Sequence, residues 1–129
     1  MRAINKIIVH CADTKSTMDV GVNEIRDWHL QRGWSDIGYH YVIRKDGTIE
    51  VGRPIEKIGS HCRCQNTGSI GVCYVGGFGG VDDRTDEQLE SMKTLINSLR
   101  HDFGNLEVRG HNEFSEKSCP NFNAFEEYN

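Results

Sequence analysis

Apolar residues gather in four short stretches of the chain, each of which predicts β-structure. INKIIVHC at 4–11 has a β-branched centre, and SIGVCYVGG at 69–77 is a short apolar run that ends in glycines. Runs of this length and composition are typical of buried strands. YHYVIRKDGTIEVGR at 39–53 sets an Asp-Gly pair between two apolar segments, which indicates a hairpin. LEVRGH at 106–111 is the last predicted strand.

Two longer stretches show the spacing of an amphipathic helix. In VNEIRDWHLQRG at 22–33 the spacing of Val22, Ile25, Trp28 and His29 predicts a helix that stops at Gly33. Thr85 and Gln88 form a capping box before a second helix, which ends at Gly104. Its apolar stripe consists of Leu89, Met92, Leu95, Ile96, Leu99 and Phe103. NAFEEY at 123–128 predicts a short terminal helix.

The order of these elements predicts the fold class. Strands alternate with helices and include one hairpin, which favours an α/β domain with a mixed central β-sheet flanked by helices. The sequence contains no repeat, low-complexity tract or linker, and 129 residues suffice for one hydrophobic core. We therefore expect a single compact domain over residues 1–129.

The charge and hydropathy of the chain limit the kinds of partner that it is expected to bind. The net charge of −4 argues against a protein built to bind nucleic acid. The longest apolar run, at 7–9, is far too short to span a membrane, so no membrane partner is expected. MRAINKIIVH at the N-terminus lacks the apolar core and cleavage site of a signal peptide. We expect synthesis in the cytoplasm without a signal peptide, and a monomeric protein.

The cysteines do not suggest a disulfide framework. There are five of them, an odd number, in a chain without a secretory signal. Cys11 and Cys73 lie in strand-like stretches, where a cysteine usually serves as a small buried hydrophobe.

Two of the predicted strands end on a histidine, His10 and His111. If these strands are neighbours, both imidazoles emerge at one sheet edge, and Cys119 can return to them as a third ligand. Two imidazoles and a thiolate suit zinc, and three protein ligands leave a fourth position open. The alternative is that each histidine is an ordinary polar residue at a strand end, because no short ligand motif joins them.

HCRC at 61–64 is a second concentration of candidate ligands. Cys62 and Cys64 could form a redox pair, but the spacing is not CxxC and no partner pair exists, so a structural zinc ribbon is not expected. The favoured interpretation is a polar loop whose His61 faces the site.

A family resemblance joins these features. The chain is similar to the type 2 N-acetylmuramoyl-L-alanine amidases, above all to the small zinc amidases of T-odd bacteriophages, and more distantly to the animal peptidoglycan recognition proteins. The resemblance runs from about Ile7 to Phe122 and rests on IIVHCADTK, EIRDWHLQRGWSDIGYHYVIRKDGTIEVGR, GSH, NTGSIGVCYVGG and RGHNEFSEKSCP.

The resemblance implies a role for individual residues. His10, His111 and Cys119 match the family's metal ligands, which implies one Zn²⁺ per chain. Tyr39 and Lys117 match its catalytic tyrosine and lysine. His61 and Asn66 are similar to residues of the substrate groove. The implied reaction is hydrolysis of the amide between N-acetylmuramic acid and L-alanine in bacterial peptidoglycan, so the protein is expected to act on the cell wall.

Departures from the family pattern limit what is carried over. The N-terminal tail of the phage relatives has no counterpart before the first strand, so binding to RNA polymerase is not expected. Cys62 and Cys64 stand where relatives have small or polar residues. Two alternatives remain open: a non-catalytic peptidoglycan-binding module of the same fold, which Cys119 argues against, and a redox or structural cysteine protein using Cys62 and Cys64.

Overall fold

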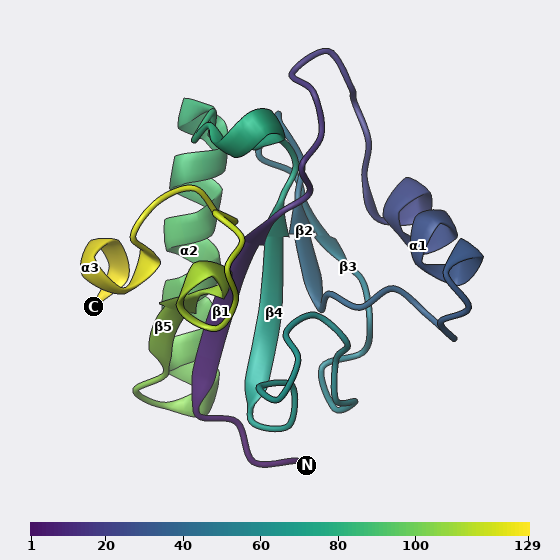
Figure 1. The fold of residues 1–129 in the computed structure, drawn as a ribbon. Helices are drawn as coiled ribbons and strands as arrows, with labels where there is room; N and C mark the ends of the chain where they lie inside the picture. The colour runs from purple at the N-terminus through teal and green to yellow at the C-terminus, as the bar shows by residue number, and fades with distance from the viewer.

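The computed structural model describes all 129 residues as one mixed five-stranded sheet flanked by helices (Figure 1). The predicted α/β class and the single compact domain are thereby confirmed. The elements, in chain order, are β1 (Lys6–Cys11), α1 (Val22–Gln31), β2 (Tyr41–Ile43), β3 (Ile49–Val51), β4 (Ser69–Tyr74), the 3₁₀ turn η1 (Phe78–Gly80), α2 (Asp86–Phe103), β5 (Glu107–Gly110), the 3₁₀ turn η2 (His111–Glu113) and α3 (Ala124–Tyr128).

The sheet has the order β3-β2-β4-β1-β5. β1 lies between β4 and β5 and is parallel to both, while β2 is parallel to β4. β3 alone is antiparallel, because it forms the predicted hairpin with β2. The ends of β1 and β5 that carry the site histidines therefore meet at one edge of the sheet.

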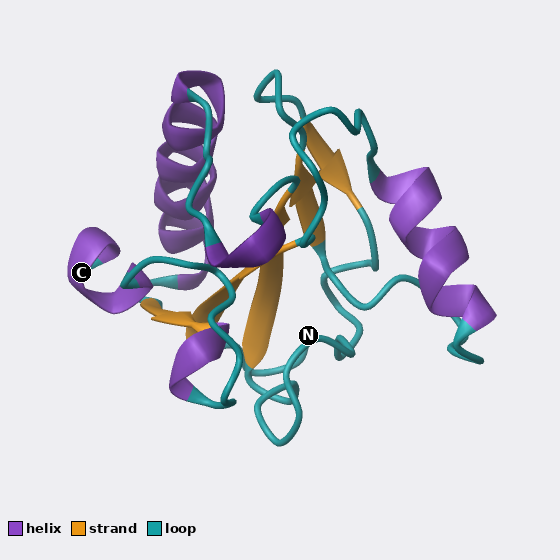
Figure 2. Cartoon of the chain, turned by 45° about the horizontal axis from the view of Figure 1, so that its top comes forward, coloured by secondary structure: helices purple, strands orange, loops and turns teal.

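Each face of the sheet has its own apolar cluster. Alternate residues of β1, Ile7, Val9 and Cys11, face α2 and pack with Met92 and Ile96 in the larger cluster. The smaller cluster lies under α1, where Val22 and Ile25 pack against Val42. The sheet lies between α2 and α1 in Figure 2. The other buried residues of β1, Ile8 and His10, alternate with these and therefore point to the α1 side of the sheet.

The predicted elements exist, and their boundaries differ for local reasons. β4 stops at Tyr74 rather than at residue 77, because Gly76 and Gly77 adopt φ values of 131° and 79° and turn the chain. α1 ends at Gln31, with Gly33 at φ 89° just beyond it. The capping box of α2 is present, with the Thr85 hydroxyl accepting from the Gln88 backbone. No helix combines the length and apolar character needed to cross a bilayer.

Candidate active site

Two histidines emerge side by side from adjacent parallel strands. The pairing of β1 with β5 ends at Val9 opposite Gly110, so His10 and His111 each directly follow the last pair between these two strands. Their ring centroids lie 4.6 Å apart. The predicted meeting of the two imidazoles is a direct result of the β1–β5 pairing.

Cys119 completes a cluster that could hold a metal ion. One ligand atom from each of His10, His111 and Cys119 can be chosen such that all three lie within 4.8 Å of one another. His10 is buried, whereas His111 and Cys119 are half-buried, so the cluster opens to solvent on one side. Two imidazoles and one thiol with an accessible fourth position fit the donor set of a catalytic zinc centre.

Burial and neighbouring groups shift the pKa values of all three side chains. It lowers the pKa of His10 well below the usual 6.5, with the neighbouring His61 and His111 acting in the same direction. Burial and, after it, the Lys117 ammonium lower the pKa of His111. Both rings are therefore neutral at pH 7, as metal binding requires. The neighbouring Cys11 thiol, followed by burial, raises the pKa of Cys119, so a metal ion must displace a proton from that thiol.

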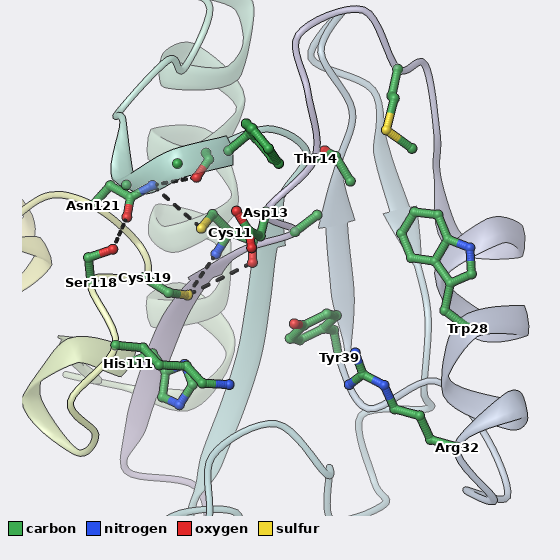
Figure 3. A pocket seen from close by; sticks show the side chains of 17 residues that line it. Cys11, Asp13, Thr14, Trp28, Arg32, Tyr39, His111, Ser118, Cys119 and Asn121 are labelled. Carbon is green, nitrogen blue, oxygen red and sulfur yellow. Dashed lines mark hydrogen bonds between the residues drawn. The ribbon is translucent and has the colours of Figure 1, made fainter.

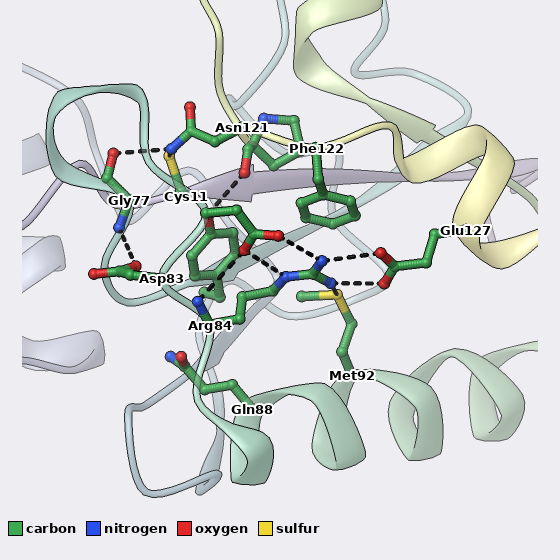
Figure 4. Close-up of polar contacts among 12 residues, drawn as sticks. Cys11, Gly77, Asp83, Arg84, Gln88, Met92, Asn121, Phe122 and Glu127 are labelled. Carbon is green, nitrogen blue, oxygen red and sulfur yellow. Dashed lines mark hydrogen bonds and ion pairs between the residues drawn. The ribbon is translucent and has the colours of Figure 1, made fainter.

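The loop that carries Cys119 is held in place by contacts of the three residues that follow it. The Tyr74 hydroxyl donates to the Pro120 carbonyl at 2.7 Å, and the Asn121 amide donates to the carbonyls of Gly77 and Val81, each at 2.9 Å. One residue further on, the Arg84 guanidinium lies 3.5 Å from the centroid of the Phe122 ring (Figure 4).

The same arginine is itself firmly held. The Arg84 side chain is only 4% exposed, and it forms ion pairs with both Asp82 and Glu127. Figure 4 shows the pair with Glu127. A guanidinium that is both paired and stacked gives the loop a rigid support. The position of Cys119 is thus determined before any metal binds.

His111 and Cys119 are among the 17 residues that line a groove of about 780 Å³, whereas the buried His10 is not. Trp28 of α1 and Arg32, directly after the helix, form one wall, and His111, Cys119 and Asn121 lie on the other side (Figure 3). Exposed apolar side chains, Met18 and Phe78, also line it. The groove therefore presents aromatic and apolar surface together with cationic groups.

Tyr39 and Lys117 both line this groove. The Tyr39 ring lies 5.1 Å from the His10 ring, between centroids, and burial raises its pKa well above 10, so its hydroxyl keeps its proton. Lys117 is exposed, and its charge reaches His111. The structure thus brings together all five residues that sequence analysis predicted as ligands or catalytic groups.

His61 and Asn66 lie elsewhere. Neither is among the residues that line the groove. The Nδ1 atom of His61 lies 2.8 Å from Nε2 of His10, and the Asn66 side-chain oxygen accepts from the backbone N–H groups of His61 and Cys62, both at 2.9 Å. His61 therefore faces the candidate ligand His10 rather than the groove, and a role for His61 or Asn66 in substrate binding stays a prediction. Cys62 is buried, Cys64 is exposed, and both are free thiols.

One groove residue had no signal in the sequence. Thr14 is buried at 4% exposure and lines the groove, and its hydroxyl is the one buried side-chain polar atom that lacks a hydrogen-bond partner. Buried hydroxyls are normally paired, and this one has no partner within the protein. A threonine after a strand is too common to single out without the structure.

A mixed sheet with a His–His–Cys set at the base of a groove defines a domain suited to metal-assisted hydrolysis. The family model described as N-acetylmuramoyl-L-alanine amidase matches residues 1–122, and the chain belongs to this family. The endolysin of Escherichia phage T7 is 43% identical over 123 residues, which cover 90% of this chain and 80% of that protein.

Solved structures agree with this assignment. The N-acetylmuramoyl-L-alanine amidase LysC of Clostridium intestinale URNW superposes with a TM-score of 0.85 at 34% identity, covering 98% of this chain and 83% of that one. Drosophila PGRP-LB, a peptidoglycan-recognition protein, superposes with a TM-score of 0.84 at 26% identity, over 98% and 80% of the two chains. The predicted likeness to the amidases of T-odd phages, and more distantly to the recognition proteins, is confirmed.

Proposed function

We propose that this protein is a zinc-dependent enzyme that hydrolyses the amide between N-acetylmuramic acid and the L-alanine of peptidoglycan. The observation that carries the proposal is the convergence of His10, His111 and Cys119 at the base of a groove that also presents Tyr39 and Lys117. Membership of the amidase family and the likeness to phage endolysins supply the reaction and the substrate.

The donor set supports zinc rather than a harder ion. Neutral imidazoles and a thiolate are soft to borderline ligands, whereas magnesium and calcium prefer oxygen. When bound, a zinc ion supplies Lewis acidity, which activates water and polarises an amide carbonyl. His10, His111 and Cys119 would hold one such ion per chain.

The remaining chemistry belongs to Lys117 and Tyr39. Attack of water on the amide carbon moves negative charge onto the carbonyl oxygen. The Lys117 ammonium, exposed in the groove, can approach that oxygen and stabilise the charge as it develops. The Tyr39 hydroxyl retains its proton, and the Tyr39 ring lies beside His10, so the hydroxyl can orient the attacking water by hydrogen bonding.

The groove walls supply substrate binding. Trp28 and Phe78 offer apolar and aromatic surface for the sugar and lactyl parts, and Thr14 offers an unpaired hydroxyl for a peptide group. A binding module without catalysis would need the groove alone. The additional presence of Cys119, Tyr39 and Lys117 favours the enzyme.

Product analysis tests the proposal. Purified protein loaded with zinc is incubated with peptidoglycan, and released amino groups and reducing sugar ends are measured separately. We expect new N-terminal L-alanine without new reducing ends, and loss of the activity in excess chelator. Reducing ends would indicate a glycosidase, and binding without any new amino group would indicate the non-catalytic module.

A further inference from the structure

The imidazole of His61 occupies a space that two glycines create behind the candidate metal cluster. A Cβ atom on Gly71 would lie 2.6 Å from ring atoms of His61, and one on Gly59 would lie 2.7 Å from its Cδ2. Gly71 belongs to β4, opposite Ile8 and two residues from the partner of His10. Both positions must lack a side chain for the ring to reach His10.

A short series of hydrogen bonds determines which nitrogen of His61 carries the proton. The Ser69 hydroxyl lies 2.7 Å from the Gln65 carbonyl, which can only accept, so the hydroxyl hydrogen points there. The Ser69 oxygen also lies 3.2 Å from Nε2 of His61. Because its only hydrogen is already used, the Ser69 oxygen must accept this second hydrogen bond, so Nε2 of His61 carries the hydrogen. A neutral imidazole has one N–H, which leaves Nδ1 of His61 as an acceptor.

The acceptor on His61 in turn determines the tautomer of His10. Nδ1 of His61 lies 2.8 Å from Nε2 of His10, so Nε2 of His10 carries the hydrogen that is donated. The lone pair of His10 is then on Nδ1. An imidazole can bind a metal only through an unprotonated nitrogen, and its other N–H is normally held by an acceptor.

We infer that His61, set by Ser69, is a positioning residue that holds His10 in the tautomer whose Nδ1 is free to bind a metal ion. The inference rests on the proposed metal site and gives His61 a role that does not involve the substrate. His61 does not line the groove, which agrees with this assignment. Asn66 contributes by holding the backbone of His61 with its side-chain oxygen.

Zinc affinity and the tautomer of His10 provide two separate tests. The variant His61→Phe keeps an aromatic ring but removes the acceptor, and loss of such a partner typically weakens metal binding about 10- to 100-fold. His61→Asn places an amide oxygen near the position of Nδ1 and should recover much of the affinity. Zinc dissociation constants are measured by competition with a chromophoric chelator.

His29→Phe is the matched control. His29 is another buried histidine whose Nδ1 accepts a hydrogen bond, from the backbone N–H of Gly38 at 2.9 Å, and it belongs to no metal cluster. It should keep the parental zinc affinity. Equal zinc affinity in His61→Phe and the parent, or an equal loss in His29→Phe, would overturn the inference.

Nitrogen-15 chemical shifts of His10 in the metal-free parent report the tautomer without any metal. We expect a protonated Nε2 and a bare Nδ1; the opposite assignment contradicts the inference. Ser69→Ala, a smaller change than His61→Phe, should make the tautomer of His10 mixed and weaken zinc binding. If the metal-free parent shows the expected tautomer yet binds no zinc, the proposed function fails while the tautomer assignment stands.

Discussion

The backbone N–H of Cys11 donates a hydrogen bond to the sulfur of Cys119 at 3.1 Å. The two residues lie 108 positions apart, and the contact joins the end of β1 to the loop after η2. A donor aimed at sulfur stabilises the thiolate more than the thiol, because the charged acceptor makes the stronger bond. His10 and Cys11 therefore both contribute to the candidate metal cluster: His10 through its imidazole, and Cys11 through its backbone N–H.

This relationship makes Cys119→Ser a sharp test of the ligand assignment. A serine hydroxyl remains within reach of the Cys11 N–H, but it is a much poorer zinc ligand than a thiolate. We expect zinc content and amide hydrolysis to fall together, while the melting temperature of the metal-free protein changes little. Cys64→Ser, at an exposed free thiol, is the control and should keep both zinc and activity. Loss of activity in Cys64→Ser would instead favour the redox alternative.

Lys117→Ala separates catalysis from metal binding. Lys117 lines the groove but belongs to no ligand set, so the variant should keep its zinc and bind substrate. Removing a donor to a developing oxyanion costs roughly 10²–10³ in rate, which should appear in kcat. Lys93→Ala, an exposed lysine of α2 across the sheet, should behave like the parent. Single-turnover rates and zinc content are measured for both variants. An unchanged rate for Lys117→Ala would show that Lys117 is a solvated surface lysine without a catalytic role.

Tyr39→Phe removes one oxygen and leaves the ring packed against His10 and His29. Zinc content should therefore stay at the parental level. The attacking water loses the hydrogen bond that orients it, and misplacing a reacting group can cost roughly 10²-fold, so we expect kcat to fall by about that factor. Tyr41→Phe is the matched control, because Tyr41 packs against the cluster on the α2 face. Zinc loss in Tyr39→Phe would mean that the hydroxyl supports the site rather than the chemistry.

Local patterns were sufficient to predict the elements of this fold. The Thr85–Gln88 capping box, the Asp-Gly hairpin and the apolar runs of β1 and β4 all depend on neighbours in the sequence, and each is present. The boundaries moved where a backbone torsion intervened, as at Gly76. Such torsions depend on the fold around the glycine, and the sequence pattern does not contain them.

Local sequence patterns predict only part of the candidate metal cluster. The histidines at the ends of β1 and β5 were visible, but their meeting depends on a sheet order that places strands 100 residues apart as neighbours. Family resemblance matches both histidines to metal ligands but does not give that order. The contact of His61 with His10 depends on the loop before β4 folding back over Gly71, and no residue pattern reports such a contact. His61 was accordingly predicted as a groove residue.

Thr14→Val tests whether the unpaired hydroxyl in the groove wall meets the substrate. Valine has nearly the same shape, and removing a buried hydroxyl that has no partner should leave the fold equally or more stable. A neutral hydrogen bond contributes about 0.5–1.5 kcal/mol, so KM should rise roughly 2- to 10-fold with kcat nearly unchanged. Thr14→Ser keeps the hydroxyl and should keep KM. An unchanged KM in Thr14→Val would assign the hydroxyl no part in binding.

Stability should fall in mild acid because buried histidines resist protonation. Burial lowers the pKa of His29 and of His40 to about 4 in the folded chain, against about 6.5 when unfolded. Below pH 6.5 the unfolded chain therefore binds protons that the folded chain does not, and falling pH favours unfolding. Each such group contributes a slope of up to about 1.4 kcal/mol per pH unit, largest between the two pKa values.

The measurement is the free energy of unfolding of chelator-treated protein at several pH values between about 6.5 and 5, above the range where carboxylates titrate. His40→Asn is the informative variant. The Nδ1 of His40 accepts from the Gly71 N–H at 3.0 Å, and its other nitrogen lies 2.8 Å from the Lys57 carbonyl, which fixes the ring as neutral with a bare Nδ1. An asparagine oxygen can take over the bond from Gly71 but does not titrate. The free energy of unfolding should depend less steeply on pH in His40→Asn than in the parent, by the contribution of one histidine. An identical slope in the two proteins would show that His40 takes up its proton equally in the folded and unfolded chains.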